Sequence, residues 1–266
     1  MDIGLIGCGK MGEAILQGIP RNGKEPRIVV SRRNRQELER IGKQYAVETG
    51  SNADAAKCGI VFLAVKPQQL DAVIPEIKDS ILPDALLVCL APGISPLYLA
   101  EKIARPDIRV IHMMPNTPCA VGAGVVAYAV GKTVDECDEQ RFVSLVSSLG
   151  ITVKVEDGQM NAVVGTSGSS PAYFYMMLDA MALAGVRAGL KKKDALRMAA
   201  QTMLGSAKMV LESGKHPSEL RDDVCSPGGT TIEAVSALEK AGFGGIVMDA
   251  VAKCVDRSAG MGKTVS

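Results

Sequence analysis

A glycine-rich segment near the N-terminus has the spacing of a phosphate-binding loop. It follows a short apolar run at residues 3–6 and precedes an amphipathic stretch at residues 11–19. In the pattern G-x-G-x-x-G, the first glycine permits a tight turn, the second lets the backbone approach a pyrophosphate, and the third permits close packing of helix on strand. The N–H groups at the helix start then bind the phosphates. We therefore predict a dinucleotide-binding loop formed by Gly7, Cys8, Gly9, Lys10, Met11 and Gly12; the alternative is a glycine-rich turn without a ligand.

The residues after the second predicted strand favour one kind of dinucleotide. NAD-binding domains usually have an acidic residue there, which hydrogen-bonds the ribose 2′-hydroxyl. This chain has Ser31 and Arg32 instead, followed by further arginines, and the next acidic residue is Glu37. A hydroxyl and clustered guanidinium groups suit a 2′-phosphate, so the sequence favours NADP(H), with NADH as a weaker alternative. The competing interpretation is a solvated basic start to the next helix.

Three further loops follow predicted strands, at residues 64–68, 90–93 and 114–118. Loops after parallel strands lie at the carboxyl edge of the sheet, where ligands bind in such folds. Proline and glycine in these loops can be purely structural, but the shared position of the loops favours a role in ligand binding.

A second candidate site lies at residues 223–234. Thr230 and Glu233 have the spacing of a capping box, which predicts the start of a helix. Gly228 and Gly229 would leave the N–H groups of this helix start accessible, and such groups beside threonine hydroxyls suit a substrate carboxylate. The alternative is a well-formed helix start that binds nothing.

These segments fall into two regions with different patterns. Through about residue 155, short β-rich runs alternate with amphipathic helical stretches, which predicts a Rossmann-like, doubly wound and mostly parallel sheet. Residues 159–258 contain no convincing strand and are rich in Ala, Met and Leu. We therefore predict an α/β domain at residues 1–155 and an all-α helical domain at residues 156–266. The predicted strands are residues 3–6, 28–30, 60–65, 86–90, 109–113, 125–130 and 151–155, and the predicted helices of the first domain are residues 11–19, 35–43, 68–77 and 136–149.

Composition argues against several classes of partner. The 266 residues carry a formal net charge of +1 and contain few aromatic residues and no Trp, which does not suit nucleic acid. The seven cysteines form no C-x-x-C pair and only two histidines are present, so we expect reduced thiols, a cytoplasmic location and no metal. The start of the chain lacks the pattern of a signal peptide. The most apolar later segment, residues 171–186, is interrupted by Asp179, so we expect no membrane partner.

Residues 223–234 resemble the signature of the pyrroline-5-carboxylate reductases. The resemblance continues in the same order along essentially the whole chain, through residues 7–12, 64–67, 114–118 and 165–173. Two positions depart from the family pattern. Ser170 stands where the family commonly has Gly, and Pro92 stands where it often has Ala; neither departure removes a functional side chain.

The resemblance implies hydride transfer from NADPH to the imine carbon of 1-pyrroline-5-carboxylate, the final step of proline biosynthesis. A protonated imine is already electrophilic and can take its proton from solvent, so the site must mainly position two rings and exclude water. The implied substrate residues are Ser226, Gly229, Thr230 and Thr231 around the carboxylate, with Thr231 also bonding the ring nitrogen as the catalytic side chain, and Asp157 as a weaker candidate. The implied cofactor residues are Ser31 and Arg32 at the 2′-phosphate, Asn52 at the adenine ribose, and Ala64, Val65, Lys66, Pro67 and Ala91 in the later loops.

The family also forms dimers through interlocked helical domains, often assembled further into rings. The implied partner is therefore a second copy of the chain, in a homodimer or a decameric ring. Apolar stretches at residues 172–189 and 232–259 are consistent with a shared core. Periodicity alone does not separate such an interface from an internal core.

Two other functions fit parts of the sequence. A β-hydroxyacid dehydrogenase would need a lysine after a glycine-rich segment, and the chain has no lysine between Lys154 and Lys191. A non-catalytic NADP-binding regulator would need only the glycine loop, and it would leave residues 226–231 without a role.

Overall fold

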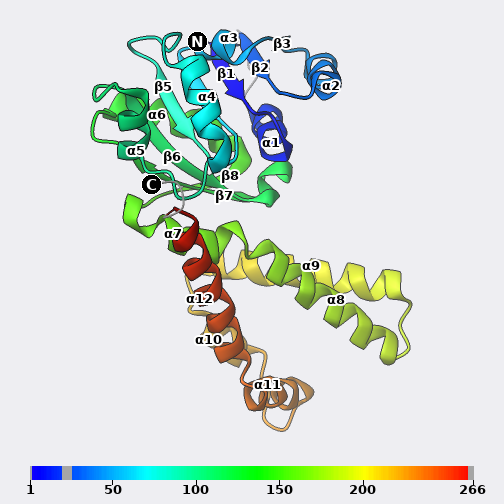
Figure 1. Ribbon diagram of the computed structural model, residues 1–266. Helices are drawn as coiled ribbons and strands as arrows, with labels where there is room; N and C mark the ends of the chain where they lie inside the picture. Colours follow the sequence, from blue (N-terminus) through cyan, green and yellow to red (C-terminus); the bar gives the residue numbers. More distant parts are fainter. Residues whose placement is uncertain (1, 20–25, 263–266) are drawn as a thin grey trace. The chain divides into compact units, whose positions relative to one another are not determined.

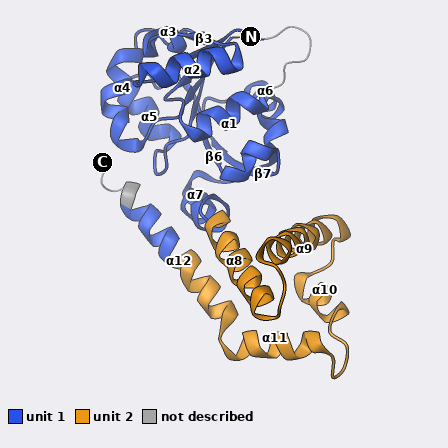
Figure 2. Cartoon of the chain, turned by 90° about the vertical axis from the view of Figure 1, so that its right-hand side faces the viewer, with its two compact units in different colours: residues 1–169, 253–266 blue, residues 170–252 orange. Residues whose placement is uncertain are grey.

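The computed structural model describes residues 2–19 and 26–262. The chain forms two compact units: unit 1 consists of Met1–Ser169 with Lys253–Ser266, and unit 2 of Ser170–Ala252 (Figure 2). The predicted domain boundary after residue 155 stays a prediction. That boundary lies one residue after the last strand, whereas the first compact unit continues to Ser169 and the second begins at Ser170.

Unit 1 is built on a sheet whose described part has eight strands in the order β3-β2-β1-β4-β5-β6-β7-β8 (Figure 1). Neighbouring strands are parallel except β7, which runs antiparallel to β6. The strand order reverses between β1 and β4, so the carboxyl ends of these two strands form the switch point where doubly wound sheets bind ligands. The mostly parallel Rossmann-like sheet predicted from the sequence is confirmed. The strands are β1 (Ile3–Ile6), β2 (Ile28–Ser31), β3 (Glu48–Thr49), β4 (Ile60–Leu63), β5 (Leu86–Cys89), β6 (Arg109–Pro115), β7 (Gly124–Val130) and β8 (Gly150–Lys154).

Short apolar sequences form the central strands because both faces of the sheet are covered. Every residue of β1, β4 and β5 is buried. Leu5 and Phe62 belong to a core cluster that includes residues of α1, α2 and α6, whereas their neighbours Ile6 and Val61 belong to a second cluster with α3, α4 and α5. Helices therefore cover each face of the sheet. They are α1 (Lys10–Gly18), α2 (Arg35–Tyr45), α3 (Asn52–Ala56), α4 (Leu70–Ile77), α5 (Pro96–Ile103) and α6 (Glu136–Val146).

A short helical segment ends the N-terminal part of unit 1, at residues 160–168. Helix α7 (Met160–Val163) passes directly into a π-helix at Val164–Gly168. The side chain of Asn116, after β6, donates to the carbonyl of Ser167 at 3.1 Å and accepts from the N–H of Val125 at 3.0 Å. One buried amide thus fixes the end of β6 and the start of β7 to this segment.

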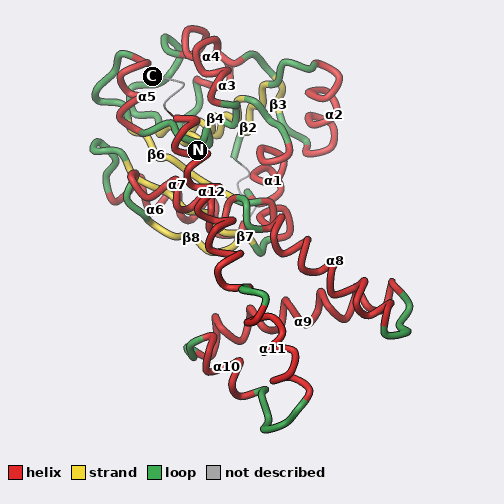
Figure 3. The backbone as a smooth tube through the Cα atoms, turned by 60° about the horizontal axis from the view of Figure 1, so that its bottom comes forward, coloured by secondary structure: helices red, strands yellow, loops and turns green. Residues whose placement is uncertain are grey.

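Unit 2 contains only helices and loops, as Figure 3 shows. Its helices are α8 (Pro171–Arg187), α9 (Lys192–Ser213), α10 (Pro217–Asp223), α11 (Thr230–Lys240) and the first half of α12 (Phe243–Gly262), whose residues from Lys253 onward belong to unit 1. The backbones of α8 and α9 approach closely because Gly185 has no side chain; a Cβ there would lie 2.8 Å from the Cβ of Ala195. The helical region predicted from the sequence is confirmed. No helix in the part of the chain that the structure describes is long and apolar enough to cross a membrane.

Candidate functional site

The loop between β1 and α1 has the geometry that the glycine pattern requires. Gly7 has a φ of +84°, a conformation that L residues rarely adopt, and a Cβ at this position would collide with Val65. A Cβ on Gly9 would meet nothing within 4 Å, which leaves room for a ligand against the backbone. A Cβ on Gly12 would lie 3.0 Å from Leu5, so this glycine lets α1 pack closely on β1.

The start of α1 presents free backbone donors to this open space. Gly9 is the N-cap and provides no side-chain hydrogen bond to the helix. The first N–H groups of a helix have no acceptor within it, and the helix dipole adds positive potential. Burial raises the pKa of the Cys8 thiol to about 12, so this side chain stays neutral beside the loop. The helix start therefore suits a phosphate.

A cavity of about 760 Å³ extends from this loop across the ends of β1 and β2. That volume lies within the roughly 300–1,000 Å³ typical of ligand pockets. Predicted cofactor residues that line it are Gly7, Cys8, Gly9, Ser31, Arg32, Asn52 and Val65. Predicted cofactor residues that do not line it are Lys10, Met11, Gly12, Ala64, Lys66, Pro67 and Ala91; of these, Gly12, Pro67 and Ala91 are buried, while Lys10 and Lys66 are exposed.

Polar side chains at the β2 end of the cavity are connected by short hydrogen bonds. The hydroxyl of Ser31 donates to Asn52 Oδ1 at 2.6 Å, and Asn52 Nδ2 donates to Glu76 Oε2 at 2.7 Å. Arg32 donates from a terminal nitrogen to the carbonyl of Cys8 at 2.7 Å, which joins the basic segment after β2 to the glycine loop. A hydroxyl, an amide and a guanidinium thus face one cavity, as a phosphorylated ribose requires.

Sequence reasoning missed several residues of this cavity. Gln68 lies in a loop that the sequence had singled out, so its position after a predicted strand could have found it. Glu76 lies on α4, and no local pattern marks it; only the tertiary fold brings it to Asn52. Arg33 and Asn34 lie in the basic segment that the sequence had singled out after the second strand. The other lining residues that were missed are Gly50, Ser51, Gln68, Gln69, Ala72, Val73 and Glu76.

In unit 2, a tight turn leads into α11. The N–H of Gly229 donates to the carbonyl of Ser226 at 3.0 Å, and Gly228 has a φ of +66°. Pro227 and Gly228 thus occupy the central positions that suit a type II turn. A Cβ on Gly229 would displace the hydroxyl of Ser226, whereas the positive φ of Gly228 is the feature of this turn that favours glycine.

The start of α11 differs from the prediction in one respect. The predicted capping box of Thr230 and Glu233 is wrong: Gly229 is the N-cap and makes no side-chain hydrogen bond, and Thr230 is the first helical residue. The spacing matched, but the turn placed the helix start one residue earlier. Because no side chain caps α11, its first N–H groups are free for an anion. Ser226 and Thr230 are exposed, and Thr231 is half-buried.

Asp157 has a different setting, within unit 1. Its Oδ1 lies 3.3 Å from Nδ1 of His112, which is 1% exposed and lies on β6. Nε2 of His112 is buried, and the described residues give it no hydrogen-bond partner. The sequence could not predict this pair, because its members lie on different elements. Among the described residues there is no group of three or more His, Cys, Asp or Glu side chains that could hold a metal.

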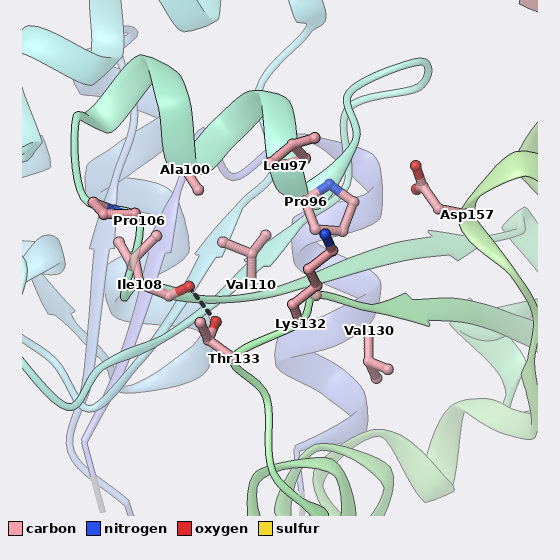
Figure 4. Close-up of a pocket in the computed structure, with 11 residues that line it drawn as sticks. Pro96, Leu97, Ala100, Pro106, Ile108, Val110, Val130, Lys132, Thr133 and Asp157 are labelled. Carbon is pink, nitrogen blue, oxygen red and sulfur yellow. Dashed lines mark hydrogen bonds between the residues drawn. The ribbon is translucent and has the colours of Figure 1, made fainter.

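Asp157 also borders a small cavity of about 240 Å³. Figure 4 shows that Pro96 and Leu97 of α5 and Val110 of β6 contribute apolar side chains, while Asp157 lies at the margin. The hydroxyl of Thr133 donates to the carbonyl of Ile108 at 2.6 Å beside this cavity. Lys132 also lines this cavity, so its lining combines apolar side chains with one ammonium and the carboxylate of Asp157.

Comparison with known proteins covers both regions of the chain. Residues 157–261 match the family model described as pyrroline-5-carboxylate reductase dimerisation. Residues 2–93 match the model described as NADP oxidoreductase, coenzyme F420-dependent.

Full-length relatives match as well. The chain is 39% identical to a pyrroline-5-carboxylate reductase of Escherichia coli (strain K12), with 98% of each protein covered. It is 42% identical to a pyrroline-5-carboxylate reductase of Pisum sativum, over 96% of this chain and 94% of the relative. The crystal structure of Plasmodium falciparum pyrroline carboxylate reductase with NADP bound is similar at a TM-score of 0.88 and 30% identity, with 98% of each chain covered.

Proposed function

The chain belongs to the pyrroline-5-carboxylate reductase family, and from this we infer that it transfers a hydride from NADPH to 1-pyrroline-5-carboxylate and so forms L-proline. The observation that carries the proposal is that α1 and α11 both begin at a glycine N-cap, Gly9 and Gly229, with no side-chain hydrogen bond to the first turn. One helix start suits the pyrophosphate of a dinucleotide, and the other suits the carboxylate of the substrate.

The cofactor residues are assigned from the resemblance to the family, and seven of them also line the cavity of unit 1. The backbone of Gly7, Cys8, Gly9, Lys10, Met11 and Gly12 holds the pyrophosphate, Ser31 and Arg32 bind the 2′-phosphate, and Asn52 binds the adenine ribose. Ala64, Val65, Lys66, Pro67 and Ala91 form the loops toward the nicotinamide. When bound, NADPH supplies the hydride; NADH is a weaker alternative, because Arg32 then has no phosphate to bind.

The substrate residues are assigned to the turn before α11. Ser226, Gly229 and Thr230 hold the carboxylate, largely through backbone N–H groups. The hydroxyl of Thr231 hydrogen-bonds the ring nitrogen and fixes the plane of the imine. The hydride adds two electrons to the imine carbon, and the ring nitrogen of the amine product retains a proton taken from solvent. No strong general base is needed, and Asp157 remains a weaker substrate candidate.

The two regions have separate tasks in this proposal. Residues 1–155 bind the cofactor, and residues 156–266 bind the substrate and join two copies of the chain. The homodimer is supported by the match to a dimerisation model and by the many exposed apolar side chains of unit 2. We propose further that such dimers assemble into a decameric ring. We also propose a cytoplasmic location, because the seven cysteines form no close pair.

The test is a reductase assay on the purified chain. We expect loss of reduced-nicotinamide absorbance when NADPH and 1-pyrroline-5-carboxylate are both present, with one L-proline formed for each NADPH consumed. Omission of the imine is the control for unspecific oxidation. If neither NADPH nor NADH is oxidised with this imine, the proposal is wrong.

A further inference from the structure

Arg32, the guanidinium assigned to the 2′-phosphate, lies close to two carboxylates. Its terminal nitrogen NH1 is 3.8 Å from Glu13 Oε1 and 3.8 Å from Glu37 Oε2. These distances are longer than a hydrogen bond, and the same nitrogen instead donates to the carbonyl of Cys8. Arg32 therefore has two anions beside it without being closely bound by either.

A second arginine holds these carboxylates. NH2 of Arg40 lies 2.8 Å from Glu13 Oε1 and 3.0 Å from Glu37 Oε2, the same two oxygen atoms that approach Arg32. Its Nε donates to Glu37 at 3.1 Å, and its NH1 donates to Gln44 at 2.6 Å. Hydrogen bonds to Glu13, and then to Glu37, raise the pKa of the Arg40 guanidinium.

Arg40 does not line the cavity, whereas Arg32 does. It lies on α2, and Glu13 lies in the first turn of α1, so the network connects two elements that follow adjacent strands. The hydroxyl of Tyr45 also donates to Glu13 Oε2, at 3.4 Å, which fixes the second oxygen of that carboxylate. Glu13 is thus held on both oxygens from the side of α2.

We propose that Arg40 is a positioning residue that determines the preference of this chain for NADPH over NADH. By binding Glu13 and Glu37, it keeps these carboxylates from pairing closely with the guanidinium of Arg32 and offsets part of the negative charge that would repel the 2′-phosphate. This inference rests on the proposed use of NADPH.

Removal of Arg40 should therefore weaken the binding only of nucleotides that carry a 2′-phosphate. In Arg40→Gln, the two carboxylates would turn to Arg32 as their cation, and the phosphate would face unneutralised negative charge. NADH has an uncharged 2′-hydroxyl at this position, which the two carboxylates do not repel.

The experiment measures the binding of 2′,5′-ADP and 5′-AMP to the full chain by calorimetry. We expect Arg40→Gln to weaken the affinity for 2′,5′-ADP by roughly tenfold, the scale of one lost charge-assisted contact. The affinity for 5′-AMP should stay within about twofold of that of the unaltered chain. The KM for NADPH should rise in parallel, with kcat and the KM for NADH nearly unchanged. Unchanged 5′-AMP binding also shows that the variant is folded at the site.

Two further variants separate positioning from loss of charge. Lys43→Gln removes one positive charge from an exposed residue of α2 to which the described structure gives no ion pair, so we expect a change in 2′,5′-ADP binding below about twofold at moderate salt. Adding Glu37→Gln to Arg40→Gln removes one of the two competing carboxylates, so part of the lost 2′,5′-ADP affinity should return.

Equal weakening of the binding of both nucleotides, an equal effect of Lys43→Gln, or no recovery with Glu37→Gln would each overturn the role of Arg40. The unaltered chain decides the premise separately: if it does not prefer 2′,5′-ADP to 5′-AMP, the proposed cofactor is wrong and the inference falls with it. If it has that preference and Arg40→Gln keeps it, only the inference is wrong. Neither readout of nucleotide binding requires the imine.

Discussion

Thr230 and Thr231 offer a matched pair at the start of α11. The proposal gives Thr230 a role mainly through its backbone N–H, which any residue except proline provides, and gives Thr231 a role through its hydroxyl. We expect Thr231→Ala to lower kcat by roughly tenfold to a hundredfold, the value of one hydrogen bond to a reacting nitrogen, with NADPH affinity unchanged. Steady-state kinetics measures kcat, and cofactor titration measures the NADPH affinity.

Thr230→Ala is the control for this prediction. It removes an equivalent hydroxyl from an exposed neighbour and should retain most of the turnover. Full activity of Thr231→Ala would mean that its hydroxyl has no part in catalysis. An equal loss in both variants would point to a general effect on the helix start.

At the scale of the residue, the sequence predicted the backbone geometry of the glycine loop, because that geometry depends on local spacing. Gly7, Gly9 and Gly12 have the turn, the open backbone and the close packing that their pattern requires. The partners of functional groups could not be predicted in this way. Glu76 beside Asn52 and Arg40 beside Glu13 come from other elements, so only the packing of helices on the sheet brings them together.

The β1–α1 loop permits a test at the scale of the element. Gly7→Ala places a Cβ at a positive φ and against Val65, so we expect it to lower the free energy of unfolding by roughly 1–3 kcal/mol and to abolish tight cofactor binding. Gly9→Ala places a Cβ in open space, so the free energy of unfolding should change by less than about 1 kcal/mol while cofactor binding is still lost.

Urea denaturation and NADPH titration of both variants separate these effects. The informative comparison is Gly9→Ala, because its folding should be intact. If Gly9→Ala binds NADPH as the unaltered chain does, no phosphate approaches this part of the backbone, and the assignment of the loop is wrong.

The elements with strong apolar patterns were predictable, and the short ones were not. All seven predicted strands are present, with bounds shifted by a residue or two. Strand β3 was missed because its two residues, Glu48 and Thr49, are exposed, and they form a strand only by pairing with β2. Helix α3 has five residues and depends on Ser51, which forms a capping box with Asp54. Helix α5 was also missed, although Ser95 caps it and Pro96 begins it.

At the scale of the whole molecule, unit 2 leaves an unusual number of large apolar side chains exposed. Met176 on α8 and Leu211 on α9 are each 74% exposed, and Ile246 on α12 is 61% exposed. Scattered apolar residues are ordinary on a surface, but a set of this size on one helical unit marks an interface. In the proposed homodimer, the second copy of the chain would bury these apolar side chains.

We therefore expect a charge on this surface to separate the copies. Met176→Glu should shift the protein toward monomers in size-exclusion chromatography with light scattering, because a buried unpaired carboxylate destabilises an interface. Leu97→Glu is the control, since Leu97 is 62% exposed on α5 of unit 1 and should leave the assembly unchanged. If Met176→Glu leaves the assembly unchanged, Met176 of α8 does not lie in the interface.

Hydride transfer from NADPH to the imine carbon of 1-pyrroline-5-carboxylate can be followed directly by isotope. The most direct measurement uses NADPH deuterated at the transferable position of the nicotinamide and analyses the product by mass spectrometry and NMR. We predict L-proline with one deuterium, bonded to the ring carbon that adjoins nitrogen and lacks the carboxylate. Unlabelled proline, deuterium at another carbon, or no proline at all would contradict the account.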